Sequence, residues 1–426
     1  MKFDPKDNAL RAIIEKGEFG MELESLRINA DGSLAQTPHP FDGDKNITRD
    51  FCENQTEMIT DVFDNIGGVL EHLKSLRGRI TDTISENGET LWPFSNPPAF
   101  SDPDDIPIAD FKGSVYRDYL AEKYGKVKML LSGIHLNFSL PQSSVEALAK
   151  SAGQNVRAFK DALYLGLAAD LLSYSWLIVF LTAASPVLDE SFFRFGGADE
   201  SLKMKLSSVR CSEAGYWNFF TPVFDYSSLF AYADSIESYV KSGDIISPSE
   251  LYYPIRVKPR GKYGLDELRS LGINHIELRM LDINPLSPIG VFERDLEFTH
   301  LLILYLLFNG SRSLSRAQQL DAVHNMKQAA HLSSDTKLVF GGSEIPVKRA
   351  AEAELLKLLD FAGSYFPQYR QAVDYQFEKL GGKCYADVIL ELFGDDYVNK
   401  GLRLAEKYGR SENHVHAFCR KCGSEL

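Results

Sequence analysis

Three segments that lie far apart in the chain alternate between apolar and polar or ionisable residues. They are residues 17–28 (GEFGMELESLRI), 133–140 (GIHLNFSL) and 273–281 (INHIELRML). Successive side chains of a β-strand point to opposite faces, so each segment predicts a strand with one apolar and one polar face. The polar faces carry Glu22, Glu24, His135, Asn137, Ser139, His275, Glu277 and Arg279. We therefore expect an antiparallel sheet with one face packed on a core.

The residue types on the polar faces indicate more than contact with water. Solvated faces usually carry Thr, Lys, Gln and Ser, whereas these faces carry glutamate, histidine and arginine, which bind ligands and take part in catalysis. Glu22 and Glu24 would stand side by side, and like charges held that close repel each other, more strongly when buried. A curved sheet whose charged face lines a cavity is therefore favoured over a surface open to solvent.

A fourth segment, residues 47–60 (ITRDFCENQTEMIT), adds Asp50, Glu53 and Glu57 to this acidic set. Oxygen ligands in this number suit a hard cation such as Mg²⁺ or Mn²⁺, and Mg²⁺ is usually held by carboxylates together with substrate phosphates. The chain has no Walker loop and no GxGxxG, HExxH or GxSxG motif, so metal ions and arginines would have to hold a nucleotide phosphate. The residues expected at this site are Glu22, Glu24, Asp50, Glu57, His135 and Glu277.

Composition narrows the class of protein. Among 426 residues the formal net charge is −13, which argues against a general binder of nucleic acid or of anionic membranes. The apolar run 171–188 contains three serines, a threonine and a proline, so a buried core helix is favoured over a membrane span. With no apolar signal segment at the start and only five scattered cysteines, we expect a cytoplasmic protein without a disulfide framework.

Periodicity predicts helices in the rest of the chain. The predicted helical regions are 69–86, 145–150 with a continuation after Gly153, 158–184, 293–308 and 350–380. Asp31-Gly32 predicts a turn, and residues 92–101 and 253–264 are predicted loops. Without a repeat or a clear linker, we expect one catalytic domain over 1–426, with the motifs in about 18–294 and a helical part in 295–426.

Several blocks of sequence carry a resemblance to a known family. They are FGMELESLR, ITRDFCENQTEMIT, LWPFSNPP, GIHLNFSLP, SSVRCSEAGYWN, YYPIRVKP and GINHIELRMLDINPLSPIGV. These blocks follow one another in the order seen in bacterial glutamate–cysteine ligase, including the amino-terminal half of bifunctional glutathione synthases. The resemblance implies an α+β, glutamine-synthetase-like fold in which a curved antiparallel sheet forms a funnel with helices outside. It also implies that ATP phosphorylates the γ-carboxylate of L-glutamate and that the amine of L-cysteine then displaces phosphate.

The resemblance further implies roles for individual residues. Two or three Mg²⁺ ions, or Mn²⁺, would be held by Glu22, Glu24, Asp50, Glu57, His135 and Glu277. Arg279 would lie near the transferred phosphate, and Arg117 and Arg210 would hold the acyl phosphate or glutamate, since a guanidinium pairs with two oxygens at once. The cysteine pocket would consist of Phe51, Tyr116, Leu120, Met129, Tyr216 and Tyr253.

Alternatives stay open at this stage. The family often has glutamine where Met129 stands, so the amine acceptor could differ from cysteine. A non-catalytic binder of glutamate or nucleotide is a rival from another class. Arg256 and Lys258 could face nucleotide or form an exposed basic loop, and His414, His416, Cys419 and Cys422 could bind zinc or form a surface tail. We expect no second ATP-dependent domain, so the expected product is γ-glutamylcysteine, made by a monomer or weak oligomer.

Overall fold

A seven-stranded antiparallel sheet organises the chain in a computed structural model that describes residues 3–109, 114–310, 313–333 and 335–410. The strand order is β2-β3-β1-β5-β7-β6, and β4 pairs with the far end of β1. The strands are β1 (Glu18–Asn29), β2 (Ile47–Arg49), β3 (Gln55–Ile59), β4 (Glu89–Leu91), β5 (Ile134–Ser139), β6 (Ile255–Lys258) and β7 (His275–Leu281), and β8 (Lys337–Phe340) pairs with β9 (Ser343–Pro346) in a separate hairpin.

The long strand β1 gives the sheet its curvature. Its first half pairs with β5, its middle with β3 and its last three residues with β4, so one strand changes neighbours along its length. A register shift on β5 between Ile134 and Leu136 adds a local bend. The sheet is open and curved, and the predicted α+β class with helices packed outside is confirmed.

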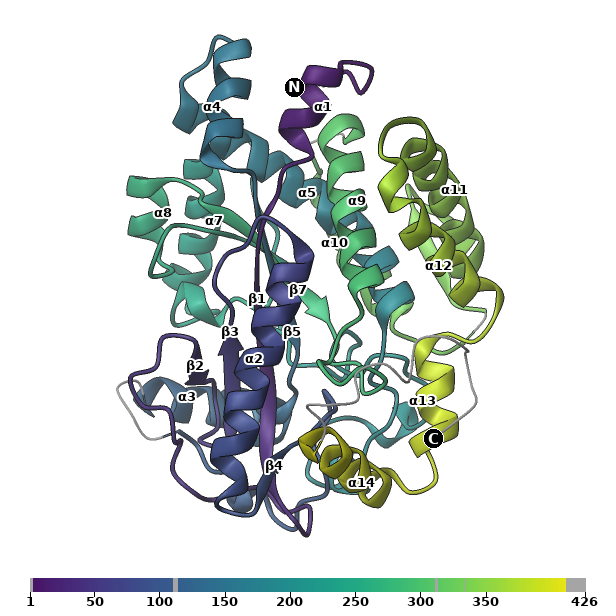
Figure 1. Cartoon of the computed structure of the whole chain (residues 1–426). Helices are drawn as coiled ribbons and strands as arrows, with labels where there is room; N and C mark the ends of the chain where they lie inside the picture. The colour runs from purple at the N-terminus through teal and green to yellow at the C-terminus, as the bar shows by residue number, and fades with distance from the viewer. Residues whose placement is uncertain (1–2, 110–113, 311–312, 334, 411–426) are drawn as a thin grey trace.

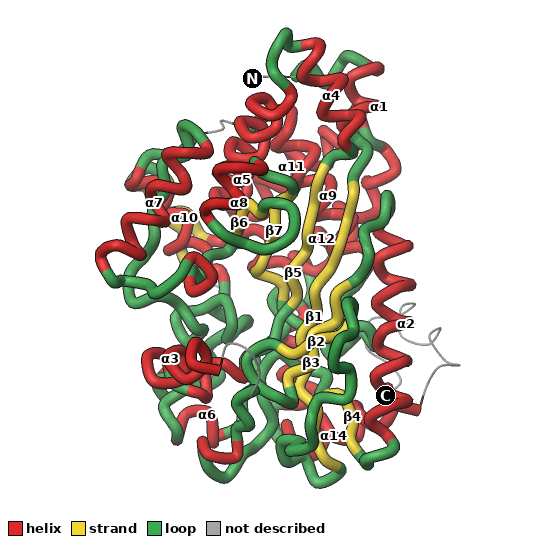
Figure 2. Tube along the Cα trace, turned by 90° about the vertical axis from the view of Figure 1, so that its left-hand side faces the viewer, coloured by secondary structure: helices red, strands yellow, loops and turns green. Residues whose placement is uncertain are grey.

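Helices cover the apolar face of the sheet. Phe19, Met21 and Leu23 of β1 lie in a large buried cluster with side chains of α2, α5 and α9, as their alternation predicts. Figure 2 shows α2 running alongside the strands, and Figure 1 shows α11 and α12 side by side at the edge of the helical layer. The helices are α1 (Asn8–Ile14), α2 (Ile66–Ser85), α3 (Ser114–Tyr124), α4 (Gln142–Ser151), α5 (Val156–Thr182), α6 (Glu190–Arg194), α7 (Leu229–Ser242), α8 (Leu265–Leu271), α9 (Glu293–Asn309), α10 (Arg316–Ala329), α11 (Val347–Tyr365), α12 (Arg370–Gly381), α13 (Tyr385–Phe393) and α14 (Tyr397–Arg410), with 3-10 turns η1 (Pro103–Asp105), η2 (Lys126–Leu130), η3 (Glu200–Leu202), η4 (Pro248–Glu250) and η5 (Pro367–Tyr369).

Helix α5 is the predicted buried core helix. It begins at the N-cap Asn155, whose side chain accepts hydrogen bonds from the next turn, and it runs for 27 residues. By length and composition α5 is the one helix in the described ranges that could cross a membrane, but 83% of its apolar window is buried inside the protein. Burial on this scale is typical of the core helix of a folded domain.

Three sequence predictions need correction or fall outside the structure. The region 350–380 is not one helix, because Pro367 cannot continue α11 and the chain restarts at α12 after η5. The region 253–264 is not a loop throughout, because β6 forms the edge of the sheet within it. The tail with His414, His416, Cys419 and Cys422 lies outside the described residues.

A buried histidine joins α9 to the sheet and predicts acid sensitivity. The His300 ring packs on Phe19 and Phe138 with centroid distances of 4.8 and 5.8 Å, and its Nδ1 lies 2.7 Å from the Tyr369 hydroxyl. Burial lowers the pKa of His300 to about 3. The unfolded chain binds this proton below pH ~6.5, so His300 makes the fold lose stability as the pH falls from ~6.5 toward ~3.

We expect His300→Gln to reduce this loss. Between pH 7 and pH 5 the unfolding free energy of the parent should fall by about 2 kcal/mol more than that of the variant, as measured by urea unfolding. The exposed His324 supplies the matched control, and His324→Gln should follow the parent. Equal pH slopes for His300→Gln and the parent would contradict the prediction.

Candidate functional site

The polar face of the sheet brings together acids from β1, β3 and β7 and the histidine of β5. In the ladder, Glu22 of β1 stands opposite His135 of β5, Glu24 opposite Glu57 of β3, and Glu277 of β7 opposite Asn137 of β5. His135 Nδ1 lies 3.1 Å from Glu22 Oε2 and 4.0 Å from Glu277 Oε1, and His135 Nε2 lies 3.9 Å from Glu24 Oε1. Side chains from distant parts of the sequence therefore form one cluster; Glu22 and His135, for example, are 113 residues apart.

The cluster is crowded with negative charge, and the neighbours decide which acids ionise. Burial and the charge of Asp50 raise the pKa of Glu24 to about 8. Burial and the charges of Glu22, Asp50 and Glu24 hold the pKa of Glu57 well above its usual range. For Glu277, burial opposes ionisation, but Arg279 and Lys258 outweigh it and hold the pKa well below the usual range. With the pKa values of Glu24 and Glu57 raised in this way, the cluster carries fewer charges than it has carboxyl groups.

Two of the three predicted arginines contact the cluster directly. Arg279 Nη1 lies 3.0 Å from Glu277 Oε2, and Arg210 Nη2 lies 3.2 Å from His135 Nε2. Arg210 also donates to the Leu281 carbonyl at 3.2 Å, and a Cβ at Gly133 would stand 2.2 Å from its guanidinium, so glycine is required for this approach. These contacts hold both guanidinium groups over the polar face of the sheet.

The third arginine and Asp50 lie at the rim. Arg117 on α3 donates from Nε and Nη2 to the Asp50 carbonyl at 2.9 and 2.7 Å, while the Asp50 residue itself is exposed. Glu53, from the same acidic segment, is placed differently. Its carboxylate accepts from the His39 backbone N–H at 2.8 Å and pairs with Arg49 at 3.0 Å, so it supports a loop.

The cluster fits a divalent cation by its donor chemistry. One ligand atom each from Glu22, His135 and Glu277 can be chosen so that all lie within 4.8 Å of one another. Carboxylate oxygens with one imidazole nitrogen suit Mg²⁺ or Mn²⁺. The buried Asn137 amide oxygen beside them has no partner in the described structure, although Asn137 Nδ2 donates to Glu22 Oε1 at 3.1 Å. Such an atom is free to accept from a ligand or from water.

An apolar and aromatic pocket borders the cluster. Phe51, Leu120 and Met129 are buried in the second hydrophobic cluster of the molecule, and Tyr116 and Tyr216 pack against it. A small cavity of about 30 Å³ lies between Arg210, Tyr216, Tyr252, Tyr253 and Arg279. Five of the six predicted pocket residues therefore belong to the second hydrophobic cluster or pack against it.

The sixth, Tyr253, borders the same small cavity as Tyr216, but it is not part of the second hydrophobic cluster. Its ring belongs to the main core and packs on Phe224 at 4.8 Å, while the ring of Tyr252 stands 4.9 Å from that of Tyr216. Neighbouring residues in extended chain face opposite ways, so the two rings pack in different hydrophobic clusters although both residues border the small cavity. Tyr252, which was not among the predicted residues, therefore joins the candidate pocket residues; the alternation that leads into β6 was the signal available.

Arg256 and Lys258 lie on β6 and not on an exposed loop. Arg256 is buried and donates to the carbonyls of Ser249 and Leu251. Lys258 Nζ lies 3.3 Å from Glu277 Oε1. Lys258 therefore belongs to the charged cluster, whereas Arg256 braces the chain that leads into β6.

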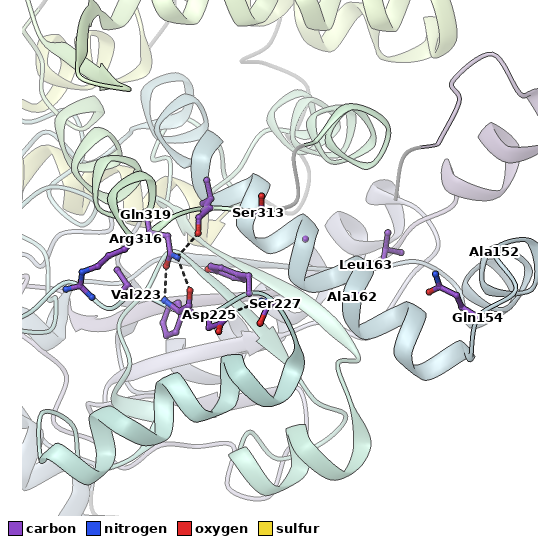
Figure 3. A pocket seen from close by; sticks show the side chains of 14 residues that line it. Ala152, Gln154, Ala162, Leu163, Val223, Asp225, Ser227, Ser313, Arg316 and Gln319 are labelled. Carbon is purple, nitrogen blue, oxygen red and sulfur yellow. Dashed lines mark hydrogen bonds between the residues drawn. The ribbon is translucent and has the colours of Figure 1, made fainter.

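A separate cavity of about 860 Å³ lies away from the acids (Figure 3). It is bordered by α5, the segment 223–227 and the start of α10. Gln319, which is buried at its wall, pairs with the Phe224 backbone through both its amide oxygen and nitrogen, at 2.8 and 2.9 Å. None of the predicted site residues borders this cavity.

The site is thus an open antiparallel sheet with acids, one histidine and flanking arginines on its polar face, residue types that are typical of enzyme active sites. The model of the glutamate-cysteine ligase family matches residues 6–246 and 244–329. The chain belongs to the glutamate-cysteine ligase family.

Named relatives support this membership. The chain is 36% identical to the glutathione biosynthesis bifunctional protein GshAB of Listeria monocytogenes over 95% of its own length and 56% of that protein, and 33% identical to that of Clostridium perfringens over 95% and 55%. The chain thus spans about half the length of these curated relatives. A bifunctional glutathione synthetase from Pasteurella multocida superposes with a TM-score of 0.83 at 26% identity, covering 95% of this chain and 54% of that one. A glutamate–cysteine ligase from Francisella tularensis, at 23% identity, shares the fold with a TM-score of 0.83, covering 93% and 88%.

Proposed function

We propose that this chain joins the γ-carboxylate of L-glutamate to the amine of L-cysteine at the expense of ATP, through a γ-glutamyl phosphate. The observation that carries the proposal is the cluster of Glu22, His135 and Glu277 beneath Arg210 and Arg279. The family membership and the named relatives, which act in glutathione biosynthesis by their names, point the same way.

The acids and the histidine of the cluster would hold two or three Mg²⁺ ions. Bound Mg²⁺ supplies positive charge that offsets the phosphate charge during phosphoryl transfer. The atoms that bind the cations would come from Glu22, Glu24, Asp50, Glu57, His135 and Glu277. Glu277 would also hold Arg279 in place through their 3.0 Å contact. Arg210 and Arg117 would bind the acyl phosphate or the glutamate carboxylates with paired N–H donors.

The aromatic pocket would select the amine. Phe51, Leu120 and Met129 offer buried apolar surface, and Tyr116, Tyr216 and Tyr252 surround it, which suits a small thiol side chain. Met129 is 5% exposed and can donate no hydrogen bond, so a polar acceptor side chain would lack a partner at this position.

The assay is direct. With Mg-ATP, L-glutamate and L-cysteine, ADP and γ-glutamylcysteine should form in equal amounts. A panel of small amines, with 2-aminobutyrate as the thiol-free analogue, tests the alternative of a different acceptor. No ADP above background with any amine would refute the enzyme proposal and would favour a non-catalytic binder.

We expect Mg²⁺ to stabilise the folded protein, because cation binding relieves repulsion in the cluster. At a concentration of 100 times its Kd, a cation that binds only the folded state adds about 2.7 kcal/mol, which should raise the thermal midpoint by several degrees. Glu22→Ala should weaken this shift. The exposed Glu344, on hairpin strand β9, provides the control, and Glu344→Ala should keep the full shift. Equal midpoints with and without Mg²⁺ in the parent would contradict the prediction.

A further inference from the structure

Glu250 is a fully buried carboxylate outside the acidic cluster. It ends η4, and its side chain has no exposed surface. Oε1 accepts hydrogen bonds from Lys123 Nζ at 2.6 Å and from the Tyr124 hydroxyl at 2.7 Å, and Oε2 accepts from the Ile246 backbone N–H at 2.6 Å. A buried charge needs partners of this kind, so the groups around Glu250 are held tightly in place.

Two of these partners lie in the last turn of α3. Lys123 Nζ also donates to the Asp244 carbonyl at 2.6 Å, so this turn is bound to the segment 244–250 at two points. One to two turns earlier, the same helix carries three residues of the candidate site, Tyr116, Arg117 and Leu120.

A second connection leads from Glu250 to the other pocket wall. The Asn218 amide nitrogen donates to the Glu250 carbonyl at 2.9 Å and to the Tyr124 hydroxyl at 3.0 Å. Its amide oxygen accepts from the Tyr252 backbone N–H at 2.9 Å. The Tyr252 ring in turn meets the rings of Tyr124 and Tyr216 at 5.3 and 4.9 Å. The segments that carry three pocket tyrosines, Tyr116, Tyr216 and Tyr252, therefore meet at one carboxylate.

We infer that Glu250 is a positioning residue for the amine acceptor: it holds α3 against the Tyr216–Tyr252 wall and so sets the shape of the acceptor pocket. This inference rests on the proposed function. Glu250 lies outside the set of groups that would touch phosphate or cation, and it acts through α3 and Asn218. Arg117, on the same helix, is held separately by its two hydrogen bonds to the Asp50 carbonyl. Loss of Glu250 should therefore change how the acceptor binds and leave formation of the acyl phosphate largely intact.

The test compares two acceptors on one acyl phosphate. Hydroxylamine is small enough to need no side-chain pocket; its nitrogen attacks the γ-carbonyl carbon, phosphate leaves, and a proton is released to give the hydroxamate. In Glu250→Gln we expect the KM for L-cysteine to rise about tenfold or more, because Lys123 loses its counter-charge and α3 shifts. Hydroxamate formation and the KM values for ATP and glutamate should stay within about threefold of the parent.

Two further variants separate positioning from general damage. Glu250→Gln combined with Lys123→Met removes the unpaired cation and should restore part of the cysteine KM. Asp295→Asn changes another buried acid, paired with Lys379 at 2.8 Å, and should lower the thermal midpoint without separating the two acceptors. A cysteine KM within twofold of the parent in Glu250→Gln, or an equal loss with both acceptors, overturns the inference. A parent that makes neither product refutes the proposed function itself.

Discussion

Glu277→Gln should lower kcat/KM about 10³-fold in the coupled ADP assay, the largest loss of activity expected from a change of one atom in this chain. Glu277 is fully buried, and its carboxylate lies 3.0 Å from Arg279 and 3.3 Å from Lys258. The amide keeps the shape but removes the charge, so a proposed cation ligand is weakened and two cations lose their counter-charge. A 10³-fold loss corresponds to about 4 kcal/mol of transition-state stabilisation.

The control for this variant is an acid of the same type on the surface. Glu344→Gln changes one partner of an exposed pair with Lys337, and such pairs contribute at most about 1 kcal/mol, so activity should match the parent. Thermal unfolding should show that Glu277→Gln is folded, and calorimetry with a non-hydrolysable Mg-ATP analogue should show weaker binding. Activity within tenfold of the parent would place Glu277 outside the reaction.

Arg27→Met should lower the free energy of unfolding by about 3–5 kcal/mol, the largest stability effect expected. The Arg27 side chain is fully buried on β1. Its Nη1 lies 2.8 Å from Glu89 Oε2, and its Nη2 donates to the carbonyls of Thr37 and Glu53 at 2.8 and 3.0 Å. Methionine fills the space of the stem but leaves the buried Glu89 carboxylate without its counter-charge. Urea unfolding at pH 7 measures the loss.

A second substitution tests the cause. Arg27→Met with Glu89→Leu removes both charges and should recover much of the lost stability, since a buried pair can often be replaced by apolar groups at little net cost. Because Arg27 lies only three residues beyond Glu24 on the same strand, both variants should also be assayed for activity. If the double variant is no more stable than Arg27→Met, the loss comes from packing and the charge explanation is wrong.

Local alternation was enough to predict the polar face of the sheet. Glu22 and Glu24 share a face with His135 and Glu277 because a strand repeats every two residues, and the ladder places them as expected. The same local rule did not identify β6, since the prolines and glycines of residues 253–264 also suit a loop, and only pairing with β7 makes residues 255–258 a strand.

Long-range contacts decided what the sequence left open. Glu250 stands in an ordinary polar stretch, SPSELYY, and its side-chain partners on α3 are 126–131 residues away. Which of the Tyr252 and Tyr253 rings packs on Tyr216 depends on how the chain enters β6. Which acids of the cluster ionise depends on burial and on Arg279 and Lys258 together.

The sequence by itself determined strands with one ionisable face and the residue types of the site, because period-two patterning and residue chemistry are local properties, and the family resemblance supplied the fold class. The tertiary structure alone decided the neighbours of each side chain, because hydrogen bonds and charge interactions act over a few ångströms between segments that only folding brings together. The Glu22–Glu24 pair shows both: alternation put the two on one face, and burial with the neighbours His135 and Asp50 determines the charge that they carry there.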